Sequence, residues 1–145
     1  MKIKNVRAID DKRHESYLEI LVNSSIDAFI ATDMKGIITL FSKGAEDIFG
    51  YKAENVVGTP ISDYYLKGKK EAKKIMKRLY EKGGLKNYET EMIVENGKRK
   101  DRTVTMNLSV SLLKDSSGEL IGTLGIGKDF TELKRIERQL QQSEK

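Results

Sequence analysis

The stretch Val104-Thr-Met-Asn-Leu-Ser-Val-Ser-Leu112 decides the fold. Apolar and polar residues alternate strictly along it, which is the pattern of a β-strand with one buried face. A second apolar run, Leu120–Lys128, follows it across an Asp-Ser-Ser-Gly turn. A third run, Tyr88–Val94, precedes it, and the intervening Asn96-Gly97 pair is a strong hairpin signal. Three consecutive strands joined by short turns predict an antiparallel sheet.

Two further strands are expected nearer the N-terminus. Ala28–Asp33 and Ile37–Phe41 are apolar, β-rich runs around a short turn that contains glycine, which predicts a hairpin. Helical patterns fill the region between this hairpin and the last three strands, at Ser42–Phe49, Ala53–Val57 and Lys67–Lys82. Antiparallel strands with helices gathered in the middle predict an α+β fold, with the helices on one face of the sheet.

An amphipathic helix is expected at each end of the domain. Residues 1–12 have no period and form a lead-in, and the first helix spans Arg13–Asn23. From Phe130 the apolar residues step by three and four between charged ones, which is the seam of a coiled coil. The expected division is therefore a lead-in at 1–12, the domain with its first helix at 13–129, and the start of an exit helix at 130–145.

Composition narrows the classes of function. The chain has 145 residues, 38% apolar and 34% charged, with a net charge of +5 and no cysteine. Disulfides, thiolate metal sites, cysteine nucleophiles and cysteinyl–flavin bonds are excluded. No apolar run approaches the roughly 20 residues of a membrane span, and Met1–Arg13 lacks the apolar core of a signal peptide. We therefore expect a single cytoplasmic domain.

Neither an enzyme nor a nucleic-acid-binding protein is expected. The acidic residues Asp33, Glu46, Asp47 and Asp63 stand near turns and helix ends, where carboxylates commonly cap, and no histidine accompanies them. The glycines of 122–127 lie within a strand, so they do not match a dinucleotide-binding loop. The lysine-rich helix is interrupted by acidic residues and has no interleaved aromatics. We therefore expect its lysines to face solvent rather than nucleic acid.

Four motifs in this order resemble the PAS domain over about His14 to Ile136. The first is Ile30-Ala-Thr-Asp33 with Gly36-Ile-Ile38, and the second is Ala45-Glu-Asp-Ile-Phe-Gly-Tyr51 with Glu54-Asn-Val-Val-Gly58. The third is Arg99-Lys-Asp101, which opens the long strand. The fourth is Gly125-Ile-Gly-Lys-Asp-Phe-Thr-Glu132, which is similar to the Asp-x-Thr hinge before the signalling helix of the family.

The resemblance implies a five-stranded antiparallel sheet with helices over one face, around a core that can hold a small molecule. It implies a sensory and dimerising module of signal transduction, attached to an effector such as a histidine kinase in a two-component system, a cyclase, a chemoreceptor or a transcription regulator. Two positions depart from the family pattern. Ser42 stands where many relatives have asparagine, and Arg102 where glycine is usual.

No bound cofactor is expected. Haem-binding relatives place their ligand histidine on the long internal helix, but the only histidine here is His14. Met76 is on that helix at the spacing of a packing residue. Covalent flavin lacks its cysteine. No metal site and no catalytic residues are expected.

A small apolar ligand, bound non-covalently, is the first hypothesis for the interior. Two inward-facing glycines and three flexible methionines would leave a plastic apolar pocket. By the family pattern, the lining residues are Ile30, Thr32, Phe49, Leu66, Ile75, Met76, Leu79, Met92, Met106, Leu108, Val110, Gly125 and Gly127. The alternative is a closed core in a ligand-free module for homodimerisation or protein–protein interaction, and the crystal-like density of protein interiors favours that filled core.

Relay and dimer surfaces complete the expectations. Asp129, Thr131 and Glu132 have the types and spacing of helix-capping residues, and the resemblance implies that this joint couples the last strand to the exit helix. Apolar residues on the first helix, the outward side of the last strand and the exit helix suggest a homodimer: Tyr17, Leu18, Leu21, Leu124, Ile126, Leu133, Ile136 and Leu140.

Overall fold

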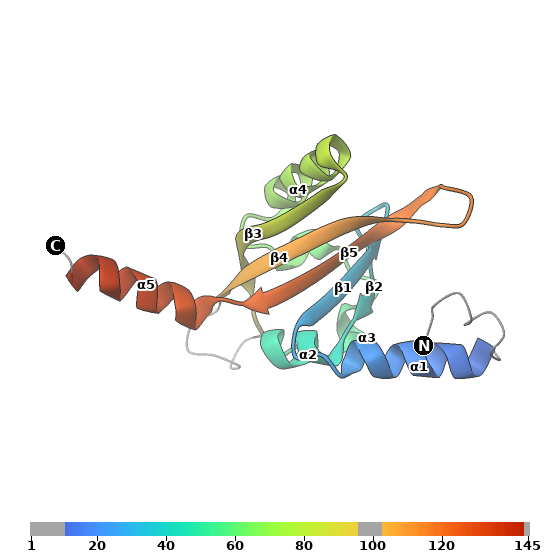
Figure 1. Cartoon of the computed structure of the whole chain (residues 1–145), viewed down its shortest axis with the longest axis horizontal. Coiled ribbons are helices and arrows are strands. Elements are labelled where there is room, and N and C mark those ends of the chain that lie inside the picture. The colour runs from blue at the N-terminus through green and yellow to red at the C-terminus, as the bar shows by residue number, and fades with distance from the viewer. Residues whose placement is uncertain (1–10, 96–102, 144–145) are drawn as a thin grey trace.

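A computed structural model describes residues 11–95 and 103–143. Five strands form one sheet in the order β2-β1-β5-β4-β3, and every neighbouring pair is antiparallel (Figure 1). The strands are β1 (Ala28–Asp33), β2 (Ile38–Phe41), β3 (Gly84–Ile93), β4 (Thr103–Lys114) and β5 (Leu120–Asp129). The helices are α1 (Asp11–Asn23), α2 (Lys43–Phe49), α3 (Ala53–Val56), the 3-10 helix η2 (Ile61–Tyr64), α4 (Lys69–Lys82) and α5 (Thr131–Ser143). The predicted α+β fold is confirmed, with a helix at each end.

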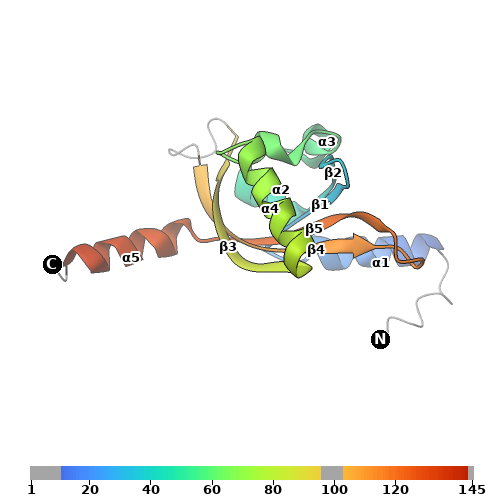
Figure 2. The same cartoon turned by 90° about the horizontal axis from the view of Figure 1, so that it is seen from above.

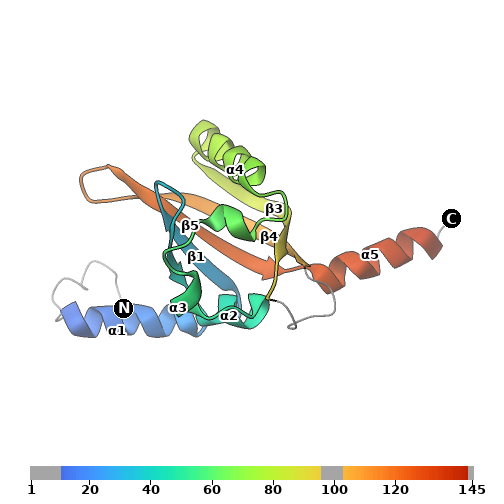
Figure 3. The same ribbon diagram turned by 180° about the vertical axis from the view of Figure 1, so that it is seen from behind.

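The four middle helices lie on one face of the sheet, as Figure 2 shows from above. The helix α1 begins at Asp11, two residues before the expected start, and α5 follows β5 almost directly. These two terminal helices point to opposite ends of the molecule in all views (Figure 3). The expected turn at Asn96-Gly97, the motif Arg99-Lys-Asp101 and the departure at Arg102 lie outside the described residues.

Strand β3 is longer than its sequence pattern indicated. It begins at Gly84 directly after α4, four residues before Tyr88. The pairing with β4 shifts register between Leu85 and Tyr88, and Asn87 adopts a left-handed backbone with φ of 54°. A bulge of this kind interrupts the alternation of side chains, so only the part from Tyr88 onward has the regular period of a strand.

Ser42 fixes α2 to the sheet. Its buried hydroxyl accepts hydrogen bonds from the backbone N–H of Ala45 at 3.2 Å and of Phe29 at 2.9 Å. The first bond caps the helix, and the second joins its start to β1. A hydroxyl oxygen has two lone pairs, so this one serine side chain serves both donors.

Candidate ligand cavity

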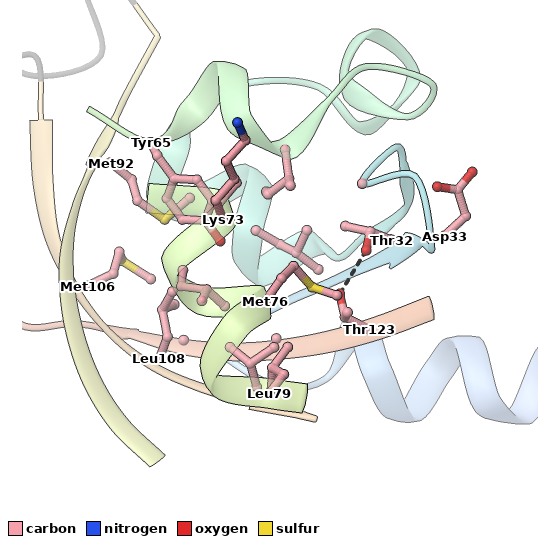
Figure 4. A pocket seen from close by; sticks show the side chains of 18 of the residues that line it. Thr32, Asp33, Tyr65, Lys73, Met76, Leu79, Met92, Met106, Leu108 and Thr123 are labelled. Carbon is pink, nitrogen blue, oxygen red and sulfur yellow. Dashed lines mark hydrogen bonds between the residues drawn. The ribbon is translucent and has the colours of Figure 1, made fainter. Parts of the chain in front are cut away.

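A cavity of about 410 Å³ lies between α4 and the sheet. Its wall on the sheet side comes from β1, β3, β4 and β5, and α4 covers it (Figure 4). Ligand pockets commonly have volumes of roughly 300–1,000 Å³. The expectation of a filled interior, which close packing favoured, is therefore wrong for this part of the core.

Two glycines of β5 face the cavity and act differently there. A Cβ on Gly125 would meet only ordinary contacts, 3.6 Å from the Ile30 carbonyl oxygen and 3.9 Å from Val110 Cγ2. A Cβ on Gly127 would lie 2.8 Å from both Leu108 Cδ2 and Met106 Cε. Gly125 therefore leaves room open, whereas the room beside Gly127 is taken by its neighbours.

Methionines supply much of the flexible wall. Met92 and Met106 are 1% and 0% exposed, and Met76 is partly buried on α4. Figure 4 shows Met92 and Met106 coming from the β3 and β4 side and Met76 from the helix. Because methionine is unbranched and has several rotatable bonds, this wall can adjust its shape to an occupant at little cost.

Tyr65 closes the cavity where Leu66 was expected to do so. The backbone there is extended, with Tyr65 bridged to Met92 and the Leu66 N–H donating to the Glu91 carbonyl at 3.0 Å. Successive side chains of extended backbone point to opposite sides. Tyr65 is consequently buried against the cavity, and Leu66 is 51% exposed and does not line it.

Two tyrosines, Tyr65 and Tyr88, lie near the buried Glu71 side chain of α4, the helix that covers the cavity. The Tyr88 hydroxyl donates a hydrogen bond to Glu71 Oε1 at 3.0 Å, and Glu71 is only 5% exposed. Burial, with the nearby Glu71 adding to it, raises the pKa of the Tyr65 hydroxyl well above its usual value. The hydrogen bond to Glu71 keeps the Tyr88 hydroxyl protonated, and the raised pKa does the same for Tyr65. This corner is therefore polar but carries no phenolate.

One polar pair stands in the wall of the cavity itself. The hydroxyls of Thr32 on β1 and Thr123 on β5 lie 2.7 Å apart, and both residues are 8% exposed. The two residues are direct partners in the β1–β5 ladder. The cavity thus combines an apolar interior with a hydroxyl pair at one place.

Exposed lining residues mark the mouth of the cavity, which we define by Lys35, Lys73, Lys77 and Tyr80. Lys35 lies in the β1–β2 turn, and the other three lie on one face of α4 at helical spacing. Asp33 also borders the cavity, but its Oδ1 accepts the backbone N–H groups of Lys35 at 2.8 Å and Ile37 at 3.0 Å. Its role here is to hold the turn.

The structure gathers every proposed lining residue except Leu66 around this one cavity. Sequence reasoning missed Thr123, Tyr65, Ile61 and the lysines of the mouth. Two signals could have found some of them. Thr123 precedes Gly125 by two positions and so shares its face of the strand, and Lys73, Lys77 and Tyr80 share a helix face with Met76.

The joint between β5 and α5 is built from the expected residues, with different roles. Asp129 Oδ1 accepts the backbone N–H of Thr131 at 3.0 Å, and Thr131 Oγ1 accepts the N–H of Thr105 on β4 at 2.9 Å. Glu132 forms an exposed ion pair with Arg135 on the same helix. Sequence reasoning missed Lys134, whose Nζ lies 3.0 Å from Glu89 Oε1 on β3.

The residues expected at a dimer contact leave apolar surface open. Leu133, Ile136 and Leu140 on α5 are 46%, 43% and 58% exposed, and Tyr17, Leu18 and Leu21 on α1 are exposed to a similar degree. Leu124 and Ile126 are half-buried on the sheet face that points away from the cavity. The three groups lie on separate parts of the molecule (Figure 1).

Within residues 11–95 and 103–143, no three histidine, aspartate or glutamate side chains gather as a metal-binding group. None of the described helices is long and apolar enough to cross a membrane.

Comparison with known proteins gives consistent matches. A family model described as the PAS fold matches residues 16–130. The signal transduction histidine-protein kinase AtoS of Escherichia coli (strain K12) is 27% identical over 127 residues, which cover 88% of this chain and 20% of that protein. The chain thus spans about a fifth of the length of this relative.

Solved structures share the fold. The PAS domain of a protein from Colwellia psychrerythraea superimposes with a TM-score of 0.71 at 22% identity, covering 85% of this chain and 99% of that one. The PAS domain of an HTR-like protein from Haloarcula marismortui has a TM-score of 0.63 at 20% identity, with coverages of 81% and 93%.

Proposed function

The chain belongs to the PAS family, and from this premise we propose that it is a sensor module that binds a small apolar ligand and relays binding through α5 to an effector. The observation that carries the proposal is the cavity of about 410 Å³ under α4. Its walls are mainly apolar and include flexible methionines. These are the features that small-molecule sites share.

The relay is proposed to run along β5. The strand borders the cavity at Gly125 and Gly127 and reaches α5 within a few residues. Asp129, Thr131 and Thr105 join the start of that helix to β5 and β4 by hydrogen bonds. An occupant that moves β5 would therefore shift the strands that hold the helix.

The effector is proposed to be a histidine kinase or a similar signalling enzyme, because the Escherichia coli relative is a histidine kinase. Two copies of this chain are proposed to pair along α5, where Leu133, Ile136 and Leu140 form an exposed stripe. Light scattering of Ile136→Lys, which places a charge in the stripe, should show a smaller mass than the unchanged chain. Glu137→Lys, beside the stripe, is the matched control and should keep the larger mass.

Native mass spectrometry of freshly purified protein is the first test of ligand binding. A few hundred daltons of non-covalent mass on the protein would support the sensor proposal. A variant that fills the cavity tests the relay without knowledge of the ligand. Gly125→Leu places a side chain in the open room, and Gly125→Ala adds one methyl group at ordinary contact distances.

Hydrogen exchange of α5 is the readout for these two variants. The expected result is a several-fold change in the exchange of α5 amides in Gly125→Leu and almost none in Gly125→Ala. Unchanged α5 exchange in Gly125→Leu, in a folded protein without bound mass, would overturn the proposal. It would favour the alternative, a ligand-free module for protein–protein contact, which the exposed apolar residues of α1 and α5 support.

A further inference from the structure

We propose that the cavity binds a medium-chain carboxylic acid, with its alkyl chain in the interior and its carboxylate at the mouth. The inference rests on the proposed function and names the class of ligand for the same cavity. Three observations carry it: the volume and apolar lining, the threonine pair, and the lysines of the mouth.

The interior sets the length of the chain. A methylene group takes up about as much room as a water molecule, roughly 30 Å³ in the liquid. A cavity of about 410 Å³ therefore holds roughly 14 such groups, which after the two carboxylate oxygens leaves room for a chain of up to roughly twelve carbons. The flexible side chains of Met92 and Met106 can close around a thin, bent chain better than around a rigid ring system.

The threonine pair supplies one hydrogen-bond donor inside the cavity. The hydroxyls of Thr32 and Thr123 carry two hydrogens, and their mutual bond at 2.7 Å uses only one of them. The second hydrogen has no acceptor among the hydrogen bonds of these side chains within the described residues. Because both residues are buried, a ligand oxygen at this place would gain a bond that water reaches poorly.

The lysines give the mouth a positive charge. Lys35 and Lys73 form no ion pair with another residue of 11–95 or 103–143, and Lys77 has only a loose one, 4.0 Å from Glu81. Figure 4 shows Lys73 extending from α4 with its ammonium group turned away from Leu108 and Leu79. Asp33 is the acidic group at the edge, and its Oδ1 accepts two backbone N–H groups of its own turn.

The threonine pair and Lys35 of the mouth lie at the same end of the cavity. Thr32 precedes Lys35 by three residues, and only the tight β1–β2 turn separates them. A carboxylate at this end can accept the free threonine hydrogen with one oxygen and face Lys35 with the other, while Lys73 and Lys77 add positive charge elsewhere along the mouth. The alkyl chain then runs toward the apolar lining residues Phe49, Met92 and Met106.

Isothermal titration with three ligands of equal chain length tests the head group. The probes are decanoate, methyl decanoate and decylammonium, at low salt. Decanoate is expected to bind about five to ten times more tightly than the methyl ester, as a few solvent-exposed charge pairs allow. Decylammonium is expected to bind most weakly. Shortening the acid should weaken binding by about fourfold for each methylene removed.

Variants separate the lysines from the threonines. The triple change Lys35→Gln, Lys73→Gln and Lys77→Gln should remove the advantage of decanoate over its ester. The matched control changes Lys67, Lys69 and Lys70 to glutamine, which removes the same charge away from the cavity and should leave the advantage intact. Thr32→Val with Thr123→Val removes both partners of the bond and should weaken the acid and the ester alike, by about fivefold.

Three results would overturn the inference. Equal affinity for decanoate and its ester, with the ester bound in the cavity, would reject the carboxylate and leave the sensor proposal standing. Tighter binding of decylammonium would reject the positive mouth in the same way. If none of the three probes binds, the medium-chain acid is rejected, and bound mass on native protein together with α5 exchange in Gly125→Leu then decides the sensor proposal separately.

Discussion

The interior of this molecule has two halves that are built differently. In the packed half, between β2, α2 and α3, the Phe41 and Phe49 ring centroids lie 6.0 Å apart, and Ile38 and Val56 are each 1% exposed. In the hollow half, under α4, methionine and glycine border a cavity of about 410 Å³. Rigid rings fill the first space, whereas flexible or absent side chains leave the second one open.

The terminal helices are attached to different halves. The helix α1 is joined to α2, where Asn23 Oδ1 accepts the Lys43 N–H at 2.9 Å. The helix α5 is joined to β5, β4 and β3 by Asp129, Thr105 and Glu89, and these three strands wall the cavity. The difference teaches where a signal can arise, because the helix proposed to carry it is tied to the half that can change shape.

The same substitution in each half measures the difference between them. Ile38→Ala in the packed half should lower the free energy of unfolding by about 4 kcal/mol, and Ile75→Ala beside the cavity by about 2 kcal/mol. Ile38 is 1% and Ile75 4% exposed, but Ile75 already borders empty space and has fewer contacts to lose. Urea unfolding of both variants checks this. Equal losses would show that the halves do not differ in packing.

Glycine substitutions on β5 sharpen the comparison within one strand. A Cβ on Gly122 would lie 1.9 Å from the Thr32 carbonyl oxygen, so Gly122→Ala should cost about 3 kcal/mol. Gly125→Ala meets only ordinary contacts and restricts the unfolded chain, so it should stabilise by about 0.5 kcal/mol. Thermal unfolding distinguishes the opposite signs. A loss at Gly125 similar to that at Gly122 would mean that the room beside Gly125 is not available.

Most of the fold could be predicted from the sequence because its signals are local. Strict alternation in 104–112 and the turn glycines locate strands without knowledge of their partners. The prediction failed where tertiary structure breaks a period. The bulge at Asn87 hid the first part of β3, and the extended backbone at Tyr65 reversed the expected roles of Tyr65 and Leu66.

The cavity was harder to predict than its lining. Alternation and helical spacing indicate which side chains face inward, and only Leu66 of the proposed lining lies elsewhere. Whether inward side chains meet depends on how far α4 stands from the sheet, which no local pattern encodes. The Thr32–Thr123 bond joins residues 91 positions apart, and the Lys134–Glu89 pair also crosses elements. Such contacts follow from strand order and register, which a single sequence specifies only indirectly.

Asp129→Ala tests whether α5 is held by the strands of the hollow half. Loss of the acceptor for the Thr131 N–H should destabilise the start of α5 by about 1 kcal/mol, roughly a fivefold rise in amide exchange, while the core stays folded. Asp129→Asn keeps an acceptor oxygen and should exchange nearly as the unchanged chain does. Asn23→Ala removes the tie of α1 to the packed half and should leave α5 unaffected. Unchanged α5 exchange in Asp129→Ala would contradict the proposed joint.

Glu89→Gln should raise amide exchange in α5 by less than Asp129→Ala does. The hydrogen bond to Glu89, with a second to Glu137, raises the pKa of Lys134 above its usual value. A raised lysine pKa stabilises the folded state at every pH below about 10.5 and loses that effect only as pH rises through the raised value. The difference between Glu89→Gln and the unchanged chain should therefore be constant from about pH 6 to 9.

Added salt separates this ion pair from the backbone bonds at Asp129. The pair is partly exposed, so roughly 1 M salt, with a screening length of about 3 Å, should nearly abolish the effect of Glu89→Gln on α5 exchange. The effect of Asp129→Ala should persist there. Glu132→Gln, which breaks an ion pair within α5 and none to the sheet, is the control. A larger change in α5 exchange for Glu89→Gln than for Asp129→Ala would show that α5 is attached mainly to the edge strand β3, and not to β5.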